Sequence, residues 1–134
     1  KSLSKRDFGR VISPLQKIGA SFITNKKKSL PLQMIGSDFA NPIIYFENRG
    51  SAQCKSTVML AALNSRGQTI IKAKKSRDHT ENIFNHLGIP IIVKKNKNFD
   101  IIKVKGQKEF KSFKYNTVMP TVISREHYSI FLTE

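Results

Sequence analysis

Cysteine and histidine, the side chains that most often hold metal ions, are scarce in this sequence. Cys54 is the only cysteine, and the histidines are His79, His86 and His127. A single thiol excludes an internal disulfide framework and a thiolate zinc site, so we expect a small buried side chain there. The histidines have no ligand spacing supported by carboxylates. We therefore expect no metal site and no cofactor.

Long apolar runs are also absent. Hydrophobic residues make up 39% of the 134 residues and charged residues 25%, a balance typical of one compact domain. No run approaches the roughly 18–20 residues that a membrane-spanning helix needs. The opening string KSLSKRDFGRVIS lacks the continuous apolar segment and the cleavage site of a signal peptide. The sequence therefore predicts a cytoplasmic protein with no membrane partner.

Acidic residues are few. There are 9 Asp and Glu against 24 Lys and Arg, a net charge of +15, which predicts affinity for anions. A nucleic-acid binder would gather this charge on one face, with aromatic side chains interleaved. The densest basic runs are residues 26–28, 72–77 and 94–97. Two of the three fall at predicted hairpin turns, where lysines are normally solvated, so nucleic-acid binding is the less favoured interpretation.

The two halves of the chain resemble each other in order and spacing. The matching strings are SKRD at 4–7 with KSRD at 75–78, IGA at 18–20 with LGI at 87–89, and IG at 35–36 with KG at 105–106. Their offsets of 71, 69 and 70 residues keep one register. The repeat predicts one structural unit occurring twice, at about residues 1–70 and about residues 71–134.

Each unit is expected to begin with a helix, because apolar residues recur at helical spacing over residues 8–18 and 83–87. Gly19 and Gly88 stand where a helix needs a left-handed residue at its end. Asp78 and Glu81 have the spacing of a capping box. Pro14 removes one backbone donor and predicts a kink in the first helix.

Short β-type runs follow each helix. Residues 21–24 and 30–35 predict one hairpin, and residues 91–95 and 99–105 predict a second. Three further strands are expected, at residues 42–47, 68–73 and 112–118. Residues 53–63 are apolar nearly all the way round, which is typical of a buried helix. This alternation of helices and strands predicts the α/β class.

Helix starts are the best candidates for binding anions, because they present free N–H groups and a partial positive charge. Ser51, Ala52 and Gln53 open the central helix. They offer a hydroxyl, room for backbone approach, and an amide that both donates and accepts. The alternative is purely structural, with Ser51 as the N-terminal cap and Gln53 on the surface.

The next predicted helix opens with Ser76 and Arg77, a hydroxyl beside a guanidinium whose fork matches phosphate. A cap beside a solvated arginine is the alternative. The repeat places Arg6 at the equivalent helix start of the first unit. Asp7 and Asp78 are interpreted as helix-start residues, and no Ser-His-Asp set, phosphate loop or carboxylate pair is visible. The residues alone thus predict an anion-binding half-site.

Longer strings carry a family resemblance. GSAQCKSTVMLAALN from Gly50, followed by SRDHTE from Ser76, resembles the central part of 5-enolpyruvylshikimate-3-phosphate (EPSP) synthases. KSLSKR from Lys1, with VI at 11–12 and PL at 14–15, resembles the stretch just upstream. The resemblance covers roughly residues 1–110. The sister UDP-N-acetylglucosamine enolpyruvyl transferases share the repeat but not the Ser-Ala-Gln and Arg-Asp-His-Thr-Glu strings.

The resemblance implies two domains, each built from three βαβαββ units in an inside-out α/β barrel. Residues 1–134 would be part of one substrate-binding domain, about one and a half to two units. It also implies transfer of the enolpyruvyl group from phosphoenolpyruvate to the 5-hydroxyl of shikimate 3-phosphate, without a metal or cofactor. The family is usually monomeric.

The resemblance assigns substrates to the candidate residues. It implies that shikimate 3-phosphate is bound by Ser51, Ala52, Gln53, Ser76 and Arg77, and phosphoenolpyruvate by Arg6 and Gln53. The family's Lys-Ser substrate loop, Gly-rich stretch and acid/base set have no counterpart in these 134 residues. We therefore expect no catalytic residue here, and turnover only with the remainder of the protein.

The last residues depart from the family pattern. Where the family has Pro-Gly-Asp and small residues, this sequence reads PTVISREH at 120–127, and its larger side chains do not permit the same tight turn. Divergence, a truncated gene and a shifted reading frame are all open explanations. Apart from an enzyme fragment, the sequence leaves open a small basic nucleic-acid-binding module and a degenerate non-catalytic paralogue.

Overall fold

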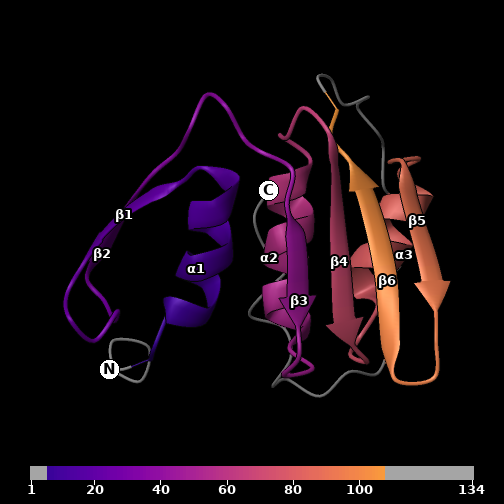
Figure 1. The fold of residues 1–134 in the computed structure, drawn as a ribbon, viewed down its shortest axis with the longest axis horizontal. Coiled ribbons are helices and arrows are strands. Elements are labelled where there is room, and N and C mark those ends of the chain that lie inside the picture. Colours follow the sequence, from indigo (N-terminus) through magenta and orange to yellow (C-terminus); the bar gives the residue numbers. More distant parts are fainter. Residues whose placement is uncertain (1–5, 108–134) are drawn as a thin grey trace, which may run out of the picture.

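The structure, a computed structural model, describes residues 6–107 (Figure 1). Its elements follow the chain in the order α1 (Gly9–Ile18), β1 (Ser21–Thr24), β2 (Leu32–Ile35), β3 (Ile44–Glu47), α2 (Ala52–Ala62), β4 (Gln68–Lys74), α3 (His79–His86), β5 (Ile91–Lys95) and β6 (Phe99–Lys105). Three predicted strands, at residues 21–24, 91–95 and 99–105, have the bounds that the structure gives. The predicted strand at 112–118 and the unusual string at 120–127 lie outside the described residues.

The strands form two separate sheets. β1 and β2 pair as an antiparallel hairpin with Ser21 opposite Ile35. The other four strands form one sheet in the order β3-β4-β6-β5. In it, β3 and β4 are parallel, whereas β6 is antiparallel to both of its neighbours. The carboxyl ends of β3 and β4 therefore lie at the same edge of the sheet, and the loops that follow them are neighbours.

The segment from β3 to β6 is one complete βαβαββ unit. α1 with β1 and β2 has the same order as α3 with β5 and β6, so the described residues contain about one and a half units. This confirms the α/β class and the expected number of units. The division at residue 70 stays a prediction, and β4 crosses that position while pairing with β3 on one side and β6 on the other.

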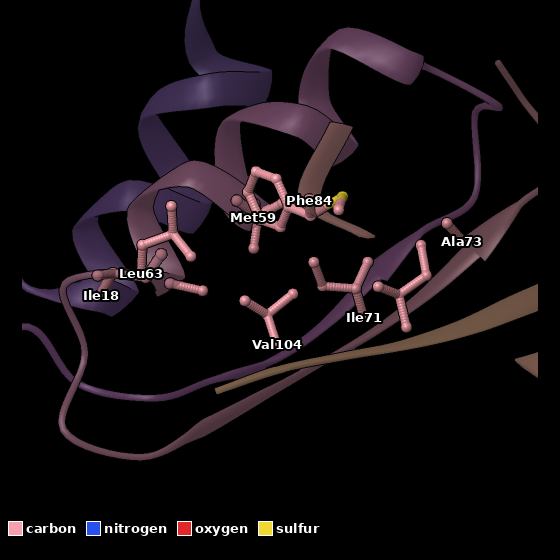
Figure 2. Close-up of a cluster of buried hydrophobic side chains, with 10 residues drawn as sticks. Ile18, Met59, Leu63, Ile71, Ala73, Phe84 and Val104 are labelled. Carbon is pink, nitrogen blue, oxygen red and sulfur yellow. The ribbon is translucent and has the colours of Figure 1, made fainter. Parts of the chain in front are cut away.

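The core lies between the four-stranded sheet and the helices. α2 and α3 cover one face of the sheet, and α1 packs against the outer side of α2 (Figure 1). Figure 2 shows the side chains that meet there, among them Met59 of α2, Phe84 of α3, Ile71 of β4 and Val104 of β6. Burial of these apolar groups is the main stabilising term. Cys54 of α2 is buried, as the sequence predicted.

The helix ends confirm two of the local predictions and contradict a third. Gly19 has φ 127° and Gly88 has φ 67°, a backbone region that suits glycine. Ile89 N–H donates to the Phe84 carbonyl at 2.9 Å, a bond typical of a helix that ends on a left-handed residue. The predicted capping box is wrong, because the Asp78 side chain makes no cap hydrogen bond. α1 continues through Pro14 without interruption.

None of the helices described in residues 6–107 has the length and apolar character that crossing a bilayer requires.

Candidate functional site

Two neighbouring loops bring most of the predicted site residues together. The first joins β3 to α2 and contains Gly50, and the second joins β4 to α3 and contains Lys75. A side-chain carbon placed on Gly50 would lie 3.4 Å from the Lys75 carbonyl oxygen. The backbones of the two loops are therefore in contact, which places the start of α2, with Ser51 and Gln53, beside the loop that carries Arg77.

A buried carboxylate shapes the first loop. Glu47, at the end of β3, is only 3% exposed. Its two oxygens accept the N–H groups of Arg49 at 3.2 Å and Ser51 at 2.9 Å, and Gly50 between them has φ 70°. The Ser51 hydroxyl then accepts the Cys54 N–H at 3.3 Å. This confirms the cap role that the sequence left open for Ser51, and it fixes where α2 begins.

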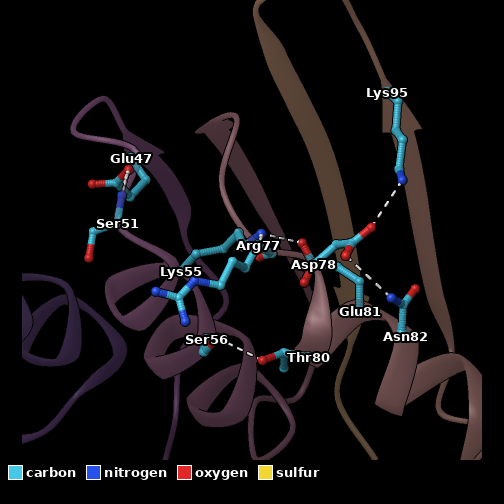
Figure 3. Close-up of polar contacts among 10 residues, drawn as sticks. All are labelled: Glu47, Ser51, Lys55, Ser56, Arg77, Asp78, Thr80, Glu81, Asn82 and Lys95. Carbon is cyan, nitrogen blue, oxygen red and sulfur yellow. Dashed lines mark hydrogen bonds and ion pairs between the residues drawn. The ribbon is translucent and has the colours of Figure 1, made fainter.

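A buried lysine fixes the second loop to α2. Lys55 is 1% exposed, and its Nζ donates to the Arg77 carbonyl at 2.7 Å. The same ammonium forms an ion pair with Glu81 of α3, with 2.5 Å between Nζ and Oε1. Figure 3 shows these contacts beside the Ser56–Thr80 hydroxyl pair, which joins the two helices at 2.7 Å. The backbone of Arg77 is thus anchored by a charged group that the sequence analysis missed.

Ser76 and Arg77 lie in the loop before α3, not in its first turn as predicted. The helix begins at His79, because Asp78 has φ −108° and ψ 24°, outside the helical region. The Ser76 hydroxyl oxygen is buried and has no hydrogen-bond partner among residues 6–107. Figure 3 shows the exposed Arg77 guanidinium turned toward α2 rather than α3. The Arg77 guanidinium thus lies on the side of the loop that faces α2, next in the chain to the unpartnered Ser76 hydroxyl.

Arg6 stands apart from these residues. It is exposed and precedes α1, which begins at Gly9 rather than at the predicted position. Asp7 takes the helix-start role, since its Oδ1 accepts the Gly9 N–H at 2.7 Å. Arg6, Asp7 and Arg10 line an open pocket of about 370 Å³. No contact in the described part of the chain joins Arg6 to Gln53, Ser76 or Arg77.

A second pocket, of about 320 Å³, links the start of α1 to the loop after β3. Its charged lining includes Arg10, Lys28 and Arg49 as well as Asp7 and Glu47. The sequence analysis did not identify this pocket, because it forms between segments about 35 residues apart that no local pattern relates. It contains none of the predicted site residues but adjoins their loop through Arg49.

Tyr45 lies beside this pocket, and burial raises the pKa of its phenol to about 12, with smaller contributions from Cys54 and Glu47. The folded state therefore favours the neutral phenol relative to an unfolded tyrosine, whose pKa is about 10. This preference for the neutral phenol of Tyr45 stabilises the fold fully below about pH 10. The stabilisation is lost as the pH rises through about 12. We expect the absorbance change at 295 nm that Tyr45→Phe removes to be centred near pH 12. A centre near pH 10 would contradict this assignment.

On the far side of α3, Asp78 accepts from Lys95 Nζ at 3.2 Å. This hydrogen bond is the largest factor that lowers the pKa of the Asp78 carboxyl. Both side chains are about half exposed, so solvent screens the pair. Asp78 is thus directed away from α2 and does not take part in the two-loop site.

Together the two loops present donors that suit an anion. The start of α2 supplies backbone N–H groups that have no partner within the helix. The second loop adds the Ser76 hydroxyl and the Arg77 guanidinium, donors that match phosphate oxygens. Within residues 6–107, no group of three or more His, Cys, Asp or Glu side chains is arranged to hold a metal ion.

Known proteins resemble this chain over most of its length. A sequence model of the EPSP synthase (3-phosphoshikimate 1-carboxyvinyltransferase) family matches residues 1–129. A 3-phosphoshikimate 1-carboxyvinyltransferase of Brucella abortus biovar 1 (strain 9-941) is 42% identical over 98 residues, which are 72% of this chain and 22% of the relative. One from Pseudomonas sp. (strain PG2982) is 41% identical over 108 residues, 79% of this chain and 24% of that protein.

A solved structure agrees with the sequence matches. EPSP synthase from Acinetobacter baumannii superposes with a TM-score of 0.71 at 33% sequence identity. The superposition covers 81% of this chain and 24% of that one. The chain therefore spans about a quarter of the length of the proteins that it matches.

Proposed function

The chain belongs to the EPSP synthase family, and on that premise we propose that it supplies part of the substrate site of a 3-phosphoshikimate 1-carboxyvinyltransferase. In this proposal the complete protein moves the enolpyruvyl group of phosphoenolpyruvate to the 5-hydroxyl of shikimate 3-phosphate and releases phosphate. The residues of this chain bind and orient substrate. The cytoplasmic location expected from the sequence is part of the same proposal.

The observation that carries the proposal is the contact between the loops after β3 and β4. It supports a joint role for Ser51, Ala52 and Gln53 with Ser76 and Arg77 in binding shikimate 3-phosphate. Buried hydroxyls nearly always have a partner, so the unpartnered Ser76 oxygen favours a ligand atom there. A phosphate oxygen would accept from this hydroxyl and from the Arg77 fork.

Phosphoenolpyruvate is assigned to Arg6 and Gln53. Arg6 is an exposed cation at the entry to α1, and α1 packs against α2, which begins beside Gln53. The assignment of both residues follows the family resemblance, since no contact within residues 6–107 joins them. Binding of the second anion between them would require groups from the remainder of the protein.

The proposal is tested by calorimetric titration of the 134-residue chain with shikimate 3-phosphate. We expect saturable binding of one equivalent, and at least tenfold weaker binding of shikimate, which lacks the phosphate. Phosphate release in the presence of phosphoenolpyruvate is expected to stay at background, because we expect no proton-transfer group among these residues. Equal affinity for shikimate and its 3-phosphate would refute the assignment of Ser76 and Arg77 to the phosphate.

A further inference from the structure

One face of the four-stranded sheet is covered by no described element. α2 and α3 pack on the opposite face, and Figure 1 views the open face directly. Alternate residues of each strand point to it, because successive side chains of a strand lie on opposite faces. On β4 the buried positions Thr69, Ile71 and Ala73 face the helices. The intervening residues, with Lys72 at their centre, form the open face.

The register fixes which side chains are neighbours on this face. One cross-strand row contains Ile44, Ile70, Lys103 and Ile92, and the next contains Phe46, Lys72, Ile101 and Lys94. The outer positions pair Gln68 with Lys105 and Lys74 with Phe99. These twelve residues are called the open sheet face below. Five of the twelve are lysines and none is acidic.

Two phenylalanine rings flank the central lysine of the open sheet face. Lys72 Nζ lies 5.9 Å from the centre of the Phe46 ring and 5.2 Å from that of the Phe99 ring. Phe46 is 65% exposed. A solvated sheet face normally carries polar side chains at such positions, so the exposed ring and its neighbours are unusual for a surface that only meets water.

The position of the lysines decides which anionic partner fits. Lys72 and Lys103 lie on β4 and β6, the two central strands. Insertion of this face into a lipid layer would bury both ammonium groups in hydrocarbon, which is costly. A single-stranded nucleic acid instead offers phosphates to the lysines and flat bases to the rings, as other sheet platforms use them.

We infer that the open sheet face binds single-stranded nucleic acid, with the lysines on phosphates and the rings of Phe46 and Phe99 on bases. This role is separate from the two-loop site, which lies at the carboxyl edge of β3 and β4 rather than on the open face. It does not depend on the proposed function.

Fluorescence anisotropy with labelled 12-nucleotide oligo-U and oligo-dT tests the inference on the full chain. We expect Phe46→Leu, which keeps an apolar side chain but removes the stacking surface, to weaken binding about 5- to 150-fold. Heparin, a polyanion without bases, should bind both forms alike. Oligonucleotide binding that is unchanged in Phe46→Leu would overturn the inference.

Charge-matched variants distinguish an effect of the open sheet face from an effect of net charge on oligonucleotide binding. Lys72→Gln with Lys103→Gln should reduce the salt slope of oligonucleotide binding by about 1.4, since each phosphate contact contributes about 0.7. Lys26→Gln with Lys97→Gln removes the same charge from the two hairpin turns and should change the slope little. Equal losses in the two pairs would refute the inference, as would preferential binding to phosphatidylserine vesicles over oligonucleotides.

Discussion

Replacing Lys55 by methionine is expected to lower the free energy of unfolding by about 3–5 kcal/mol, the usual effect of removing one partner of a buried ion pair. Glu81 would stay buried without its counter-charge, and the Arg77 carbonyl would lose its donor. Methionine has nearly the same length as lysine, so loss of packing contributes little. The midpoint of thermal unfolding should fall by roughly 10–20 °C.

Two companion variants make this result specific. Lys95→Met breaks the half-exposed pair with Asp78 and should change stability little, because solvent screens that pair. Lys55→Met combined with Glu81→Met removes both charges and should recover much of the loss, because an apolar pair of similar volume can replace a buried ion pair. A Lys55 variant as stable as the Lys95 variant would show that the buried pair does not hold the loop.

Replacing Arg77 by alanine is expected to weaken binding of shikimate 3-phosphate about 10- to 150-fold. A charge-assisted hydrogen bond contributes about 1.5–3 kcal/mol, and Arg77 would supply a two-pronged one. Its guanidinium is exposed and has no partner within residues 6–107, so the substitution removes no contact that stabilises the fold. Stability should therefore stay within about 0.5 kcal/mol of the parent chain.

Two control variants test whether the effect depends on the shape of the Arg77 side chain and on its position in the fold. Arg77→Lys keeps the charge but loses the planar fork, so its affinity should lie between those of the parent and the alanine variant. Arg66→Ala removes an arginine from the loop between the end of α2 and the start of β4, away from the two-loop site. There it lies 5.1 Å from the centre of the Phe39 ring. It should leave binding unchanged. Similar losses in Arg66→Ala and Arg77→Ala would indicate a general effect of net charge instead of a phosphate site.

The parts of the fold that local chemistry decides were predictable from the sequence. Gly19 and Gly88 mark helix ends because only glycine adopts their φ without strain. The hairpin of β5 and β6 follows from two β-type runs separated by a short polar turn. The burial of Cys54 follows from its place in a helix that is apolar nearly all the way round.

The predicted capping box failed because each of its two carboxylates pairs with a residue of another element. Asp78 and Glu81 have the spacing of a capping box, but Glu81 pairs with Lys55 and Asp78 with Lys95. Both partners come from other elements, so a local pattern could not reveal them. The helix nevertheless begins directly after Asp78, at His79, so Ser76 and Arg77 stay in the loop.

The residues that hold the site in place were missed for a related reason. Lys55 was counted as part of an apolar helix, although a lysine between Cys54 and Val58 on the buried side is itself a signal of a buried ion pair. No local sequence pattern predicts the role of Glu47. Its carboxylate accepts two backbone N–H groups, and these reach it only because the chain turns at Gly50. The contact between the two loops depends on the parallel pairing of β3 and β4, which joins residues more than twenty positions apart.

The most direct test of the account is a residue-resolved NMR titration of the labelled 134-residue chain with shikimate 3-phosphate. The central claim is that the loops after β3 and β4 form one phosphate-binding site. It predicts saturable shifts with a common dissociation constant at Ser51, Gln53, Ser76 and Arg77, and smaller ones at the open sheet face. Shifts confined to the lysines of the hairpin turns, or none in either loop, would contradict it.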